Sequence, residues 1–108
     1  MKLTVTNLLA PPADLHEEYF ETLLQRSGIR VERIVSNGQA TPAGEWYDQA
    51  WDEWVLLLAG EAALQIEGEN EPRRLLPGDC MLLPAHCRHR VEFTAPGEQT
   101  VWLALHFD

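Results

Sequence analysis

From Ile29 onward the chain is a succession of short runs rich in β-branched and aliphatic residues. Turn-forming groups such as Asn37-Gly38, Gly68-Glu69-Asn70 and Pro77-Gly78-Asp79 separate the runs at short intervals. The runs cover residues 29–36, 45–49, 53–59, 62–67, 73–76, 80–83, 87–94 and 100–107. About eight strands at this spacing, without helical segments between them, predict an antiparallel barrel or sandwich rather than a parallel sheet.

The residues before Ile29 have a different pattern, which predicts a short helix over residues 15–25. Asp14 would cap its first turn, and Ser27-Gly28 would end it. The apolar side chains at helical spacing are Leu15, Tyr19, Phe20, Leu23 and Leu24. We therefore divide one domain into an N-terminal segment with a helix, residues 1–28, and a β-region, residues 29–108.

Charge and length exclude several classes of protein. The formal net charge is −9, from 17 acidic against 8 basic residues, and such a surface disfavours nucleic acid and anionic membranes as partners. A chain of 108 residues fits one domain. No apolar stretch has the length of a secretion signal or a membrane span, so we expect a cytoplasmic protein in which Cys80 and Cys87 are reduced.

Two groups of residues resemble the conserved motifs of the cupin superfamily. Glu53 is followed by six residues and Gly60, which is similar to the second half of the first cupin motif. Gly78, Pro84 and His89 have the spacing of the second motif. The resemblance extends from about Ile29 to the C-terminus and implies an antiparallel jelly-roll (cupin) barrel around a central cavity.

The cupin resemblance also implies a metal site, in which two histidines, a glutamate and a later histidine converge on one divalent ion. Here the two earlier histidine positions hold Tyr47 and Gln49, or Trp46 and Asp48 if the spacing to Glu53 is one residue longer. We prefer the first register because a phenol and an amide suit a polar pocket. The implied ligands are then Gln49, Glu53 and His89, a weak set that would suit iron, manganese, nickel or zinc with water.

Glu53 and His89 have a second interpretation, in which they form a buried, charge-assisted pair that holds no metal. In the second motif His86 replaces a glycine and Phe93 replaces an asparagine. The candidates for contact with a bound small molecule are Tyr47, His86, Trp102 and His106. Arg73, Arg74, Arg88 and Arg90 either flank a cavity mouth or lie on an exposed strand face.

Two functions follow from these residues. The first is a metal-dependent cupin enzyme of the dioxygenase, isomerase or decarboxylase type, in which Glu53 or His89 moves a proton on a small oxygenated metabolite. The second is a cupin without metal that binds a small molecule or is purely structural. Residues 54–58 are apolar on both strand faces, and we therefore expect a homodimer that covers one of them.

Overall fold

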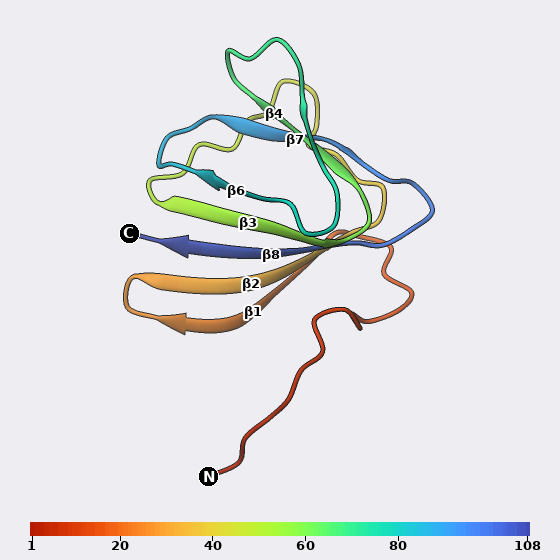
Figure 1. Cartoon of the computed structure of the whole chain (residues 1–108), viewed down its shortest axis with the longest axis vertical. Helices are drawn as coiled ribbons and strands as arrows, with labels where there is room; N and C mark the ends of the chain where they lie inside the picture. The colour runs from red at the N-terminus through yellow and green to blue at the C-terminus, as the bar shows by residue number, and fades with distance from the viewer.

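The computed structural model describes residues 1–108 as two antiparallel β-sheets (Figure 1). The strands are β1 (Tyr19–Arg26), β2 (Ile29–Ser36), β3 (Asp52–Ala59), β4 (Ala62–Ile66), β5 (Arg73–Leu75), β6 (Cys80–Leu83), β7 (His89–Thr94) and β8 (Thr100–Phe107). The large sheet has the order β1-β2-β8-β3-β6, and the small sheet has the order β5-β4-β7. The prediction of an all-β antiparallel fold is confirmed, and the strand order shows no pairing between the two sheets.

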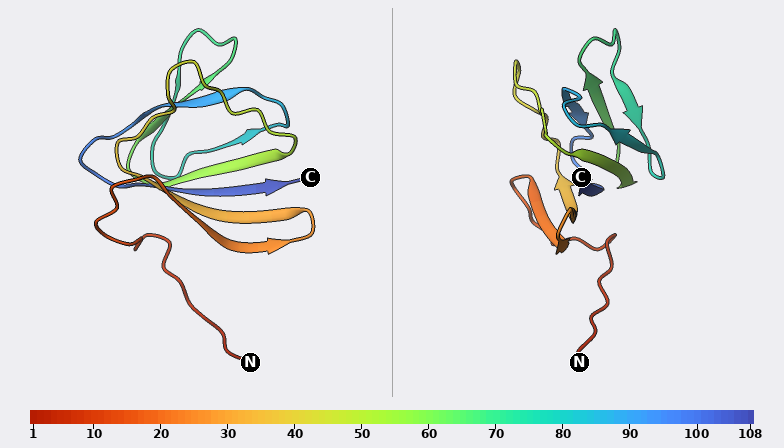
Figure 2. Two further views of the ribbon diagram at one scale, coloured as in Figure 1. Left: turned by 180° about the vertical axis from the view of Figure 1, so that it is seen from behind. Right: turned by 90° about the vertical axis from the view of Figure 1, so that its left-hand side faces the viewer.

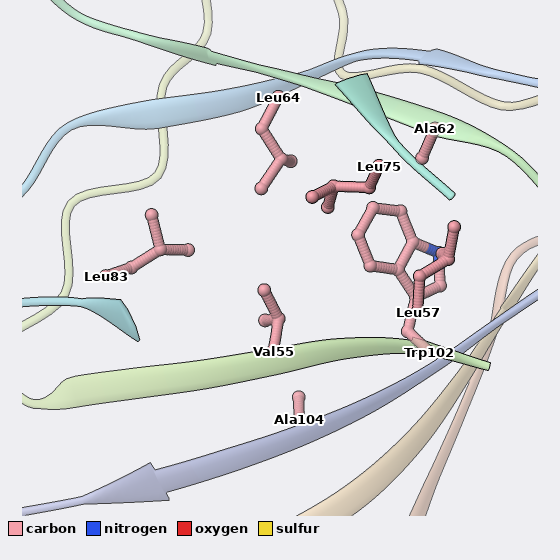
Figure 3. Close-up of a cluster of buried hydrophobic side chains, with 8 residues drawn as sticks. All are labelled: Val55, Leu57, Ala62, Leu64, Leu75, Leu83, Trp102 and Ala104. Atoms are coloured by element: carbon pink, nitrogen blue, oxygen red, sulfur yellow. The ribbon is translucent and has the colours of Figure 1, made fainter. Parts of the chain in front are cut away.

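The hydrophobic core lies between the two sheets (Figure 3). Its buried members are Val55 and Leu57 of β3, Ala62 and Leu64 of β4, Leu75 of β5, Leu83 of β6, and Trp102 and Ala104 of β8. Each strand contributes alternate side chains because successive residues of a strand point to opposite faces. The two sheets thus enclose an apolar interior. A cavity continues from this interior, and Val55, Leu64, Leu83 and Trp102 belong to both.

The predicted helix over residues 15–25 is wrong, because Tyr19–Arg26 is strand β1. It forms a hairpin with β2 through Ser27 and Gly28, whose φ is +80°. The pairing shifts by one residue between Thr22 and Leu24, so Leu23 lies in a bulge. Because the bulge interrupts the two-residue alternation of side chains between faces, the apolar residues of β1 have a spacing that also fits a helix. The segment before Tyr19 forms no regular element and extends away from the sheets at its start (Figure 2).

The predicted strand over residues 45–49 is also absent as a regular element. Tyr47 alone forms an isolated bridge with His89, through hydrogen bonds of 2.7 and 3.1 Å between the two backbones. The His86 amide donates to the Gln49 carbonyl at 2.7 Å. These contacts hold the segment alongside the start of β7 without a continuous ladder, which places its side chains beside those of the small sheet.

The outer face of the large sheet carries an apolar row across three strands. Leu82 of β6 lies opposite Trp54 of β3, and Trp54 lies opposite Leu105 of β8. The apolar side chain of Leu82 is 51% exposed to solvent. Contiguous apolar surface of this kind is typical of a subunit contact. No helix in the structure is long and apolar enough to cross a membrane.

The homodimer remains a prediction that this row makes testable. Light scattering of the purified chain should give twice the 12.3 kDa of one chain, and Leu82→Glu should shift the mass toward the monomer because it places a charge in the contact. Glu71→Gln is the control on a distant exposed loop. A wild-type mass of one chain at all concentrations would contradict the prediction.

Candidate active site

A cavity of about 260 Å³ opens between the two sheets. Its lining residues come from both sheets and from the segment around Tyr47: Glu18, Phe20, Arg30, Glu32, Ile34, Tyr47, Gln49, Glu53, Val55, Leu64, Leu83, His89, Val91, Trp102 and His106. Apolar side chains form much of the wall, and a small number of ionisable groups converge inside it. This combination is typical of a binding site for a small molecule.

Strand register places the polar groups of the large sheet in one row. Arg30 of β2 lies opposite His106 of β8, and His106 lies opposite Glu53 of β3. Because directly opposed residues point to the same side of a sheet, the three side chains all face the cavity. His89 reaches the same cavity from β7, on the facing sheet.

Glu53 and His89 form the centre of the site. Both are buried, with exposures of 6% and 5%. Their atoms Oε1 and Nε2 are 3.8 Å apart, a distance that allows an ion pair but is longer than a hydrogen bond. The Nδ1 atom of His89 lies 2.8 Å from the Cys87 carbonyl oxygen, which can only accept. His89 therefore carries its proton on Nδ1 when neutral, and leaves the Nε2 lone pair directed at the cavity.

Burial raises the pKa of the Glu53 carboxyl above its ordinary value, because the charged form loses its hydration. His106, His89 and the Gln49 side chain act in the opposite direction, and the net shift remains upward. Burial and the nearby carboxylates, of which Glu18 is the strongest influence, also raise the pKa of Tyr47. The Tyr47 ring stacks on His89, with centroids 5.5 Å apart.

The raised pKa of Glu53 predicts a pH-dependent stability. The native state binds the Glu53 proton more tightly than the unfolded chain does, so its contribution to the free energy of unfolding falls as pH rises from about 4.3 through the native pKa. Glu53→Gln removes this loss and should be more stable than the wild type at neutral pH. Thermal unfolding of both proteins across pH should show the difference growing as pH rises toward the native pKa of Glu53 and levelling above it. A difference that shrinks with pH would contradict the shift.

A second histidine, His106, is held at both ring nitrogens. Trp51 Nε1 lies 3.0 Å from its Nδ1, and Glu32 Oε1 lies 3.0 Å from its Nε2. Because an indole N–H can only donate, Nδ1 accepts and the Nε2 proton is directed at Glu32. The contact with Trp51 thus fixes the tautomer of a neutral His106 ring, and Glu32 is engaged by the contact with Nε2.

The two cavity histidines should therefore differ in tautomer. At a pH where both rings are neutral, ¹⁵N NMR should show the proton of His89 on Nδ1 and that of His106 on Nε2. Trp51→Phe removes the donor to His106 Nδ1 and should change the ¹⁵N shifts of His106 while leaving those of His89 in place. Identical tautomers in the wild type would contradict the geometry.

The donor set fits a resident transition metal poorly. No group of three or more histidine, cysteine, aspartate or glutamate side chains is arranged to hold an ion. His89 offers one free ring nitrogen, whereas both nitrogens of His106 are already engaged. Gln49 and Tyr47 supply only an amide and a phenol with a raised pKa, which are weak ligands for zinc, nickel, iron or manganese. Of the predicted ligands Gln49, Glu53 and His89, only Glu53 and His89 are strong donors, so the predicted set does not form a resident transition-metal site.

The structure brings most of the sequence-predicted residues to one place. Tyr47, Gln49, Trp102 and His106 line the cavity with Glu53 and His89. His86 does not: its ring lies outside, with Nδ1 2.8 Å from Asp48 Oδ1 and 70% of the side chain exposed. Its backbone φ is +62°, which explains why the cupin motif has glycine there.

The residues of the site that sequence reasoning missed include Arg30 and Glu32 of β2. Arg30 and Glu32 alternate along β2 with Val31 and Arg33 of its other face. Both faces carry charge, so alternation does not show which of them lines a cavity. The four arginines considered as candidates for the cavity mouth do not line the cavity. Three of them form surface ion pairs with glutamates: Arg73 with Glu69, Arg74 with Glu61, and Arg88 with Glu67. The fourth, Arg90, donates from NH2 to the Thr41 carbonyl.

The two facing sheets and the positions of Glu53, Gly60, Gly78, Pro84 and His89 define the class of this protein. Residues 33–106 match the model of the cupin domain, and the chain belongs to the cupin family. The match covers most of the β-region, including the Glu53–His89 pair and the cavity residues from Ile34 to His106. The lining residues Glu18, Phe20, Arg30 and Glu32 lie before its start.

Solved structures similar to this chain share its fold. One is a putative mannose-6-phosphate isomerase from Ralstonia eutropha JMP134, with 50% sequence identity and a TM-score of 0.93 over 98% of this chain and 99% of that one. A cupin superfamily protein from Desulfitobacterium hafniense DCB-2 has 18% identity and a TM-score of 0.77, over 99% and 92% of the two chains. A DMSP lyase from Ruegeria pomeroyi DSS-3 has 23% identity and a TM-score of 0.70, over 91% and 51%. The sequence matches no curated protein.

Proposed function

We propose that this cupin binds a small oxygenated metabolite in its cavity and isomerises it, with Glu53 and His89 moving protons to and from the substrate. The observation that carries the proposal is the buried pair itself: a carboxyl with a raised pKa lies 3.8 Å from an imidazole nitrogen that no other protein group occupies. Groups of this kind, inside a cavity, are typical of general acid–base catalysis.

The reaction best suited to this pair is the interconversion of a hydroxy-aldehyde and a hydroxy-ketone. The Glu53 carboxylate removes a proton from the carbon beside the carbonyl group, and His89, protonated at both ring nitrogens, gives its Nε2 proton to the carbonyl oxygen. Glu53 then returns its proton to the former carbonyl carbon, and Nε2 of His89 recovers one from the neighbouring hydroxyl. No proton is gained or lost overall, and no co-reactant is required.

The surrounding side chains suit such a substrate. Val55, Leu64 and Trp102 give the cavity apolar walls, which limit water around the developing charge. The Ralstonia relative, described as an isomerase of a phosphorylated sugar, is half identical to this chain and supports the same type of reaction here. The cavity volume of about 260 Å³ suits a small ligand rather than a polymer.

Proton exchange with solvent tests this function directly. Chelator-treated protein is incubated in D₂O with a panel of small hydroxy-aldehydes and hydroxy-ketones, some of them phosphorylated, and NMR follows deuterium on the carbon beside the carbonyl group. We expect deuterium incorporation together with the isomer. Binding without incorporation would instead support the non-catalytic ligand-binding cupin, and no binding or exchange would contradict the proposal.

Elemental analysis of protein purified without added metal or chelator separates the metal-dependent alternative. Near-stoichiometric metal in the wild type that is lost in His89→Ala would favour a metal enzyme over the proposed proton transfer. Exchange activity that survives chelation, in protein without stoichiometric metal, would support the Glu53–His89 mechanism.

A further inference from the structure

One basic side chain faces the cavity without a partner. Arg30 is the only lysine or arginine among the residues that line it. No hydrogen bond or ion pair joins its guanidinium to any protein group, and its Nε is buried and unpaired. Arg30 lies directly opposite His106, which in turn lies opposite Glu53, so its side chain belongs to the same row as Glu53.

Other arginines of the chain have partners. The buried Arg33, also on β2, pairs with Glu21 and donates to the carbonyls of Asn7 and Leu8. The carboxylate nearest along the strand to Arg30 on its own face is Glu32, and that carboxylate contacts His106 instead. A buried donor without an acceptor is unfavourable, and a guanidinium cannot lose its charge to avoid this cost.

The position of Arg30 makes it accessible to a ligand from both sides. Besides the main cavity, it lines a second, more open depression of about 210 Å³ at the hairpin end of the large sheet, together with Gln25, Arg26 and Trp51. Arg30 thus lies where the interior meets the surface. The remaining charged groups that line the main cavity, Glu18, Glu32 and Glu53, are acidic and would repel an anion.

We propose that Arg30 binds an anionic oxygen group, a carboxylate or a phosphate, at one end of the ligand. This inference rests on the proposed function and adds the class of substrate: an anionic hydroxy-carbonyl compound. One strand separates Arg30 from Glu53, so their backbones are roughly 10 Å apart, and a short-chain molecule held by its anionic end would place a carbon near the carboxylate of Glu53. The planar guanidinium suits both anions because it can donate two parallel hydrogen bonds.

Three non-reacting probes of equal carbon number test the assignment: glycerate, glycerol 3-phosphate and glycerol. NMR-monitored titration of the full chain should give at least one anion about tenfold tighter binding than glycerol, or about 1.4 kcal/mol. Arg30→Met should abolish this preference without weakening glycerol, and Arg30→Lys should retain part of it. Preference for glycerate over glycerol 3-phosphate, or the reverse, identifies the anion.

Arg88→Met is the matched control, because Arg88 is a surface arginine paired with Glu67, and it should leave all three affinities unchanged. Wild-type protein that binds neither anion, or binds both no better than glycerol, would overturn the assignment without need of a variant. A preference that survives in Arg30→Met would also overturn it. The probes do not react, so the binding measurement is independent of deuterium exchange. The anion preference can hold when exchange is absent, and exchange can occur without the preference. Failure of the proposed isomerisation and failure of the Arg30 assignment can therefore be distinguished.

Discussion

Replacing Glu53 by glutamine is expected to lower the rate of carbon-bound deuterium exchange by about 10²- to 10⁴-fold. Glutamine keeps the shape of the side chain but cannot take up the substrate proton. His89→Gln should reduce the rate to a similar extent, because the Nε2 atom that faces Glu53 at 3.8 Å is lost. The double variant should be little worse than either single variant, since groups that act as a unit are not additive.

The matched control for both changes is His86→Asn. His86 is exposed and lies outside the cavity, and asparagine tolerates the left-handed backbone found there. The control should keep the wild-type rate. Exchange at the wild-type rate in Glu53→Gln, with the fold intact by circular dichroism, would show that another group removes the proton.

The largest stability effect is expected at Gly60, the glycine of the first cupin motif. Its φ is +87°, and an added Cβ would overlap the Thr100 side chain and lie 2.7 Å from the Thr100 Cα. Thr100 is fully buried at the start of β8, so neither backbone can easily yield. Gly60→Ala should cost about 3 kcal/mol or more, from left-handed strain and overlap together.

Gly68→Ala separates the two causes. Gly68 has a φ of +91°, but an added Cβ there would meet no atom within 4 Å. Its cost should be only about 1–2 kcal/mol, from the backbone conformation alone. Denaturant unfolding of both variants measures the difference. Equal destabilisation would mean that the close approach between Gly60 and β8 has no energetic consequence.

Much of the fold could be predicted because local signals agree with the tertiary structure after Ile29. Short β-rich runs and turn residues there correspond to strands β2 to β8, apart from the irregular segment around Tyr47. The failure before Ile29 has a local cause: the bulge at Leu23 mixes the two faces of β1. Ser27-Gly28 ends a helix or joins a hairpin equally well, and only the pairing with β2 decides between them.

The site could be predicted only where a motif fixes the residue. Glu53 and His89 occupy motif positions. Spacing allows two registers for the earlier ligand positions, and the polarity of Tyr47 and Gln49 favours the one whose residues line the cavity. Arg30 and Glu32 belong to no motif. Which face of β2 points into the cavity is decided by what packs on the opposite face. That face holds the buried Val35 and Arg33, and Arg33 binds the N-terminal segment around Asn7. Such contacts between distant residues are not visible in sequence alternation.

The central claim is that Glu53 and His89 move protons to and from a substrate rather than form a permanent ion pair. NMR titration of the ¹³C-labelled Glu53 carboxyl measures this most directly, with His89→Gln as the comparison that removes one of the groups favouring the carboxylate. The structure predicts a Glu53 pKa above the ordinary value of about 4.3, which rises further in His89→Gln because His89 favours the carboxylate. A Glu53 pKa at or below that ordinary value in the wild type would contradict the claim and indicate a structural ion pair.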